Sequence, residues 1–104
     1  MSAPVYRVFV ENRTAEEVRE LIRANPDSTL NGDAYTEEGF VTDSASAAKA
    51  LKSQLRDCLN YGYQMARAAL RNAGKRHQTG TLEAEWRASA VIIDPNPEGQ
   101  HLMR

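Results

Sequence analysis

Cationic, amide and aromatic side chains recur at intervals of three or four residues between residues 52 and 75 of this chain. On a helix, side chains at this spacing lie along one side of the surface. The set comprises Lys52, Arg56, Asn60, Tyr63, Arg67, Arg71 and Lys75. A cationic face of this kind attracts phosphate or carboxylate groups, although most such faces are simply solvated, with their long stems covering apolar neighbours.

The loop from Gly74 to Gly80 directly follows this face and combines two glycines with cationic and polar side chains. Backbone and side-chain donors in such a loop can hold an anion. The loop is not a Walker motif, because Ala69 and Arg76 stand where that motif requires a glycine and a hydroxyl residue. We therefore predict an anion-binding site, with a solvated helix exit as the alternative. Its members are Arg56, Tyr63, Arg67, Arg71, Lys75, Arg76, His77 and Thr79.

The remaining reactive side chains form no catalytic or metal-binding pattern. His77, His101 and Cys58 lack the spacing of metal ligands, so we expect no metal and no cofactor. Cys58 falls beside an apolar stripe, which favours a buried thiol. Glu83 and Glu85 are interpreted as a solvated strand face, and no serine has a neighbouring base that would support covalent catalysis.

The formal net charge of -1 conceals an uneven distribution along the 104 residues. Residues 1–43 carry nine acids and four arginines, whereas residues 44–78 carry seven bases and one acid. Such asymmetry can steer an anionic partner to the basic segment, or it can pair the two halves of one chain or of two chains.

Length and composition indicate one domain, residues 1–94, followed by a C-terminal tail, residues 95–104, that we expect to be flexible. No apolar run approaches the length of a membrane span, so no membrane partner is expected. The single cysteine and the lack of a cationic and apolar leader favour a cytoplasmic protein.

Hydrophobic patterns and capping residues predict the elements of the first half of the chain. Residues 4–11 are β-branched and aromatic, which is typical of a buried strand. Thr14 and Glu17 form a capping box that starts a helix, and this helix is expected to end near Ala24. Residues 34–42 are interpreted as a short hairpin.

The second half is predicted to contain a long helix and a long strand. The helix begins after Asp43 or Ser44 and is expected to end at Gly74. Apolar residues then alternate from Thr81 to Ile93, which indicates a strand. The predicted class is α+β: an antiparallel sheet with two helices on one face, in the ferredoxin-like β-α-β-β-α-β order, with a long second helix.

The predicted second helix is too long for one compact chain to cover. About 30 helical residues span roughly 45 Å, whereas a compact globule of this size is about 33 Å across. We therefore expect a homo-oligomer in which a second copy packs against the small residues of the helix, which are Ala48, Gly62, Ala66, Ala69 and Ala73. The alternatives are packing of these residues against the chain's own sheet, a bend of the helix near Gly62, and fraying of the helix before Gly74.

These features favour a small, non-enzymatic, oligomeric binding protein that presents a cationic helix face and loop to nucleic acid or a nucleotide. The alternative is an interaction module or inhibitor that binds a partner protein, such as an acidic protein surface, without a small ligand. A third interpretation is a small enzyme whose active site forms at a subunit interface near His77. The ferredoxin-like order hosts many unrelated functions and does not decide among these.

Overall fold

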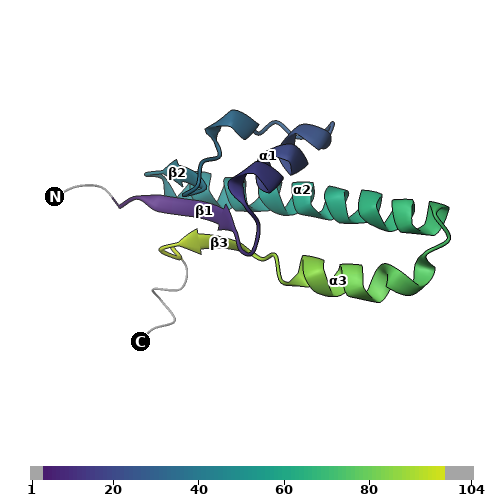
Figure 1. The fold of residues 1–104 in the computed structure, drawn as a ribbon. Coiled ribbons are helices and arrows are strands. Elements are labelled where there is room, and N and C mark those ends of the chain that lie inside the picture. Colours follow the sequence, from purple (N-terminus) through teal and green to yellow (C-terminus); the bar gives the residue numbers. More distant parts are fainter. Residues whose placement is uncertain (1–3, 98–104) are drawn as a thin grey trace.

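The computed structural model describes residues 4–97, which form a mixed α+β structure with a three-stranded antiparallel sheet and three helices (Figure 1). The sheet lies at one end of a long helix, and the last helix lies beside the other end (Figure 1). The elements in chain order are β1 (Tyr6–Val10), α1 (Ala15–Ala24), β2 (Phe40–Thr42), α2 (Ala45–Asn72), α3 (Thr79–Arg87) and β3 (Val91–Asp94).

β1 is the central strand of the sheet, with β2 on one side and β3 on the other. Val8 of β1 pairs with Phe40 on one side and with Ile93 on the other, and all three side chains are buried. The preceding residue, Arg7, pairs with Val41, which is 53% exposed. Alternation along the strands therefore gives the sheet one face that packs on the helices and one open face.

The core lies between the inner face of the sheet and helices α1 and α2. Its most deeply buried large side chains are Val8, Val18, Leu55 and Cys58. The expected burial of Cys58 is confirmed, and its thiol lies 3.6 Å from Nδ2 of Asn25 and 3.5 Å from Oγ of Ser28.

Helix α1 begins at the predicted capping box. Oγ1 of Thr14 accepts a hydrogen bond from the backbone N–H of Glu17 at 3.1 Å, and Oε1 of Glu17 accepts one from the N–H of Thr14 at 2.9 Å. The helix ends at Ala24, immediately before Asn25 and Pro26, because proline disfavours a helical conformation in the residue that precedes it.

Helix α2 is the predicted long helix, and it runs without a break through Gly62. Its 28 residues span about 42 Å, so the molecule is elongated, with extents of 57 × 33 × 21 Å. The suggested bend at Gly62 is therefore wrong.

Both ends of α2 carry the expected caps. Oγ of Ser44 accepts a hydrogen bond from the N–H of Ala47 at 3.2 Å. At the other end Gly74 has a φ of 71°, and the N–H of Lys75 donates to the carbonyl oxygen of Leu70 at 2.8 Å. This is a Schellman cap, whose left-handed position is accessible to glycine without strain.

The long strand predicted over residues 81–93 is wrong, because α3 occupies most of this segment and β3 only its end. Alanine is a good helix former, and the alanines of the segment produced the apparent alternation. The half-buried residues of α3 instead follow a helical spacing of three or four residues. They are Thr79, Leu82, Glu83 and Trp86.

The predicted hairpin over residues 34–42 contains one strand of the sheet, β2, rather than two. Thr36 and Gly39 form an isolated bridge across a tight turn. Tyr35 is buried, and its hydroxyl oxygen accepts a hydrogen bond from the N–H of Val10 at 3.0 Å, past the pairing of Val8 with Phe40, the first residue of β2. Because the described part of the chain contains three strands, the ferredoxin-like order is not confirmed.

The small residue at the middle of α2 packs against the chain's own helices. A Cβ atom added to Gly62 would lie 2.5 Å from Cδ2 of Leu21 in α1 and 2.8 Å from Cη2 of Trp86 in α3. Gly62 therefore makes room for an intramolecular contact, and the length of α2 is no longer an argument for a second copy. The homo-oligomer stays a prediction.

Within residues 4–97, no helix combines the length and apolar character that crossing a membrane requires. The expected flexible tail begins at residue 95, and from residue 98 onward, including His101, it lies outside the described residues.

Candidate functional site

The cationic face predicted from the sequence is present on α2. Because the helix is continuous, Lys52, Arg56, Arg67 and Arg71 lie along one side of it, over about 28 Å. The three arginines are exposed and Lys52 is half-buried. We call these four residues the cationic face.

The acidic N-terminal segment pairs with its own arginines. Arg19 lies 3.0 Å from Glu16, and Arg23 lies 2.7 Å from Asp33. The other two arginines of the segment also pair with acids. Within residues 4–97, by contrast, no member of the cationic face makes an ion pair. Pairing between the cationic face and the chain's own acids, one of the alternatives above, is thus not observed in these residues.

A groove runs beside the cationic face, between α2 and the segment that leads from α3 into β3. It has two adjoining hollows of about 310 and 480 Å³, which we call the aromatic slot and the cationic hollow. Both are lined by Leu59, Asn60, Trp86 and Arg87. The slot is completed by Tyr63 and Glu83, and the hollow by Lys52, Arg56, Ser89, Ala90 and Val91.

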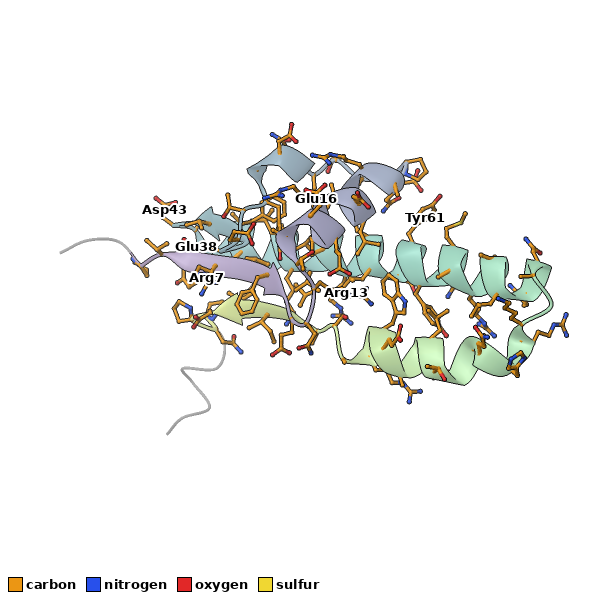
Figure 2. The ribbon with its side chains drawn as sticks, in the orientation of Figure 1. Arg7, Arg13, Glu16, Glu38, Asp43 and Tyr61 are labelled. Carbon is orange, nitrogen blue, oxygen red and sulfur yellow. The ribbon has the colours of Figure 1, made fainter. Side chains whose placement is uncertain are left out.

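The aromatic slot has a wall of two rings. The centroids of Tyr63 and Trp86 are 6.1 Å apart, with the ring planes inclined at 62°. The guanidinium of Arg13, which reaches toward α3 in Figure 2, lies 4.5 Å from the centroid of the Trp86 ring and holds it in place. Glu83, the acid in the slot, forms an ion pair with Arg87. The slot therefore offers a preorganised, mainly apolar surface to a flat ring.

The cationic hollow gathers Lys52 and Arg56 from α2 and Arg87 from the end of α3. The described residues that line it include no acid. A third hollow of about 260 Å³ extends past Lys52 and Arg56 toward Ile93. An anion in this region would meet cations on both walls of the groove, where each attraction is stronger than in open water.

The structure separates the predicted site residues into three groups. Arg56 and Tyr63 line the groove. Arg67 and Arg71 continue the same face of α2 beyond the groove. Of the remaining members, Lys75, Arg76 and His77 lie between α2 and α3, and Thr79 is the first residue of α3.

The predicted anion-binding loop is a short helical connection rather than a cradle. Residues 76–78 form a 3₁₀ turn that leads directly into α3, and Lys75, Arg76 and His77 are exposed. The hydroxyl of Thr79 donates a hydrogen bond to the carbonyl oxygen of Arg76, so it is already engaged with the backbone. None of the four residues lines the groove.

Other chemistry finds little support in the described residues. No group of three His, Cys, Asp or Glu side chains in residues 4–97 could hold a metal ion. His77 has no hydrogen bond or ion pair to an acid in that range, and Cys58 is buried in the core.

Sequence reasoning missed Trp86 and Arg87 as site residues, because it placed them on a strand. The helical spacing of Leu82 and Trp86 was the signal that could have revealed them. Comparison of the chain with protein-family models, with curated proteins and with solved structures found no match.

Proposed function

We propose that this protein is a non-enzymatic binding protein that holds a phosphate-bearing ligand, nucleic acid or a nucleotide, along the cationic face of α2. One observation carries the proposal. All four arginines of the N-terminal segment pair with acids, whereas the cationic face has no ion pair within residues 4–97. Like charges at helical spacing repel one another, and phosphates along the face relieve that repulsion.

Salt dependence measures how many phosphates the face contacts. For a single-stranded ligand, the slope of log K against log salt is about -0.7 per phosphate contact. If each of the four cations contacts one phosphate, the slope is about -3, and removal of two cations leaves about -1.5. Binding that depends on apolar contacts alone has no such slope.

The test compares two variants with the same change in net charge. Arg67→Gln/Arg71→Gln removes two charges from the face, and Gln54→Glu/Met65→Glu adds two acids at exposed positions on the opposite side of α2 that do not line the groove. We expect only the first variant to halve the salt slope for an oligonucleotide, measured by fluorescence anisotropy. Equal slopes for both variants and the parent contradict the proposal.

A second candidate is a protein-interaction module, which the open face of the sheet favours. Val5 and Val41 are 54% and 53% exposed there, and Arg7 and Asp94 lie 3.8 Å apart on the same face. An apolar patch with polar neighbours is typical of an interface. Light scattering of the parent and of Val41→Glu tests whether this face binds a second copy of the chain. A parent mass above that of one chain, with a lower mass for the variant, supports this candidate. The mass of one chain for both proteins opposes self-association.

A further inference from the structure

The aromatic slot and the cationic hollow adjoin, and this arrangement distinguishes the groove from a simple charged surface. They share four lining residues, among them Trp86 and Asn60. A ligand that fills both needs a flat apolar ring directly linked to an anion. A nucleotide unit has both parts, because its base has an aromatic face and its backbone carries phosphate.

Cations lie on both sides of the slot along α2. Lys52 and Arg56 precede Tyr63, and Arg67 and Arg71 follow it. From Arg56 to Arg67 the helix rises about 16 Å, since it advances about 1.5 Å per residue. Successive phosphates of a stacked strand are about 3.4 Å apart along its axis, so a ligand that contacts both pairs of cations contains several nucleotides. A mononucleotide reaches one side only.

The shape of the slot favours a single strand over a duplex. The rings of Tyr63 and Trp86 that form its wall are inclined at 62°, so a base stacks on the face of one ring with the other ring beside it, and this requires a base whose own face is free. In a duplex both faces of each interior base are covered by neighbouring bases. We infer that the ligand is a single strand of nucleic acid, with one base stacked on the Tyr63–Trp86 wall and phosphates on the cations to either side. This inference rests on the proposed function and specifies its ligand.

The experiment compares ligands that carry the same charges with and without bases. The probes are oligodeoxythymidine of about 12 nucleotides, inorganic polyphosphate of matched length, thymidine monophosphate and a DNA duplex of the same length. Trp86 is the single tryptophan of the chain, so quenching of its fluorescence reports a base in the slot. The other readout is the dissociation constant of each probe at fixed salt.

The variants test whether binding needs the aromatic ring of Tyr63 or only an apolar side chain at that position. Tyr63→Leu keeps an apolar side chain beside Trp86 but removes the ring, whereas Tyr63→Phe retains the ring. The matched control is Tyr61→Leu, because Tyr61 lies on the same helix but projects to the side away from α3 (Figure 2) and does not line the slot. Circular dichroism of each variant verifies that the fold is intact.

We expect oligodeoxythymidine to bind more tightly than polyphosphate and to quench Trp86. Tyr63→Leu should weaken oligonucleotide binding roughly 5- to 100-fold, the range for loss of one stacked base, and leave polyphosphate binding unchanged. Tyr63→Phe and Tyr61→Leu should bind as the parent does.

Three results overturn the inference while leaving the proposed function in place: equal binding of oligonucleotide and polyphosphate, a Tyr63→Leu effect that is absent or the same for both probes, and duplex binding as tight as that of the single strand. Thymidine monophosphate that binds as tightly as the oligomer overturns the single strand as the ligand. If neither polyphosphate nor any oligonucleotide binds, the proposed function itself fails and this inference fails with it.

Discussion

Substitution of Gly62 by alanine tests the packing of the three helices directly. The new Cβ atom would lie 2.5 Å from Cδ2 of Leu21 and 2.8 Å from Cη2 of Trp86, closer than real Cβ contacts. Leu21 can rotate its terminal methyl group away. Trp86 is a rigid ring held between α2 and the guanidinium of Arg13, so α3 has to move for the alanine to fit.

The expected free-energy change has two opposing parts. Overpacking at such a contact costs about 1–3 kcal/mol, while replacing glycine by alanine inside a helix gains about 1 kcal/mol. Gly80 of α3 provides the matched control, because its added Cβ atom meets nothing within 4 Å. Gly80→Ala should therefore be neutral or stabilising by up to about 1 kcal/mol. The two variants should differ by about 1–3 kcal/mol, which isolates the crowding at Gly62.

Urea denaturation followed by circular dichroism measures both variants against the parent. We expect Gly62→Ala to have a lower transition midpoint than Gly80→Ala, with the same slope of free energy against urea concentration. If Gly62→Ala is as stable as Gly80→Ala, then Trp86 does not lie against Gly62, and the docking of α3 described above is wrong.

Two further predictions concern the hydrogen bonds of Tyr35 and Thr14. Tyr35→Phe leaves the N–H of Val10 without its acceptor and should lower the unfolding free energy by about 1–3 kcal/mol, measured by urea denaturation. Burial raises the pKa of Tyr35 above its ordinary value of 10.0, so the folded state favours the neutral side chain. The parent should therefore lose stability above pH 10, and Tyr35→Phe should not show this part of the loss. Thr14→Ala removes the capping box and should cost about 1 kcal/mol in the same assay. The backbone hydrogen bond from Thr14 lowers the pKa of Glu17 below 4.5. The stability that Glu17 contributes is therefore present above pH 4.5 and should be lost as the pH falls below it. Glu17→Gln should not show this loss in thermal melts. The role given to Tyr35 is wrong if Tyr35→Phe is as stable as the parent. The role given to Glu17 is wrong if Glu17→Gln loses as much stability below pH 4.5 as the parent does.

Local signals predicted those elements whose ends are marked by hydrogen-bonding residues. The capping box at Thr14, the N-cap at Ser44 and the left-handed Gly74 each fix a helix terminus within a few residues, so sequence alone placed α1 and α2 correctly. Residues 79–87 carry no such marker, since no side chain caps the start of α3. Over nine residues, alternation and helical spacing share too many positions to be separated by pattern alone.

The candidate site divides in the same way. Its charges were predictable, because Arg56, Arg67 and Arg71 lie on one element with a regular repeat. The groove was not, because it needs Trp86 and Arg87 beside α2, and their position depends on a tertiary contact at Gly62. Which residues of different elements lie beside one another depends on tertiary packing, and a single sequence contains little information about that packing.

The cationic face lies on α2 alone, whereas the aromatic slot needs both α2 and α3, and this separates their contributions to binding. The cationic face belongs to α2 alone and persists as long as that helix is folded. The slot exists only while α3 is docked, because Trp86 forms one side of its aromatic wall and Tyr63 the other. A perturbation that loosens α3, such as Gly62→Ala, acts on the stacking of a base and leaves the attraction for phosphate intact. A strand at residues 81–93 would have placed Trp86 in a sheet, and the cationic face would then have no aromatic neighbour from this segment.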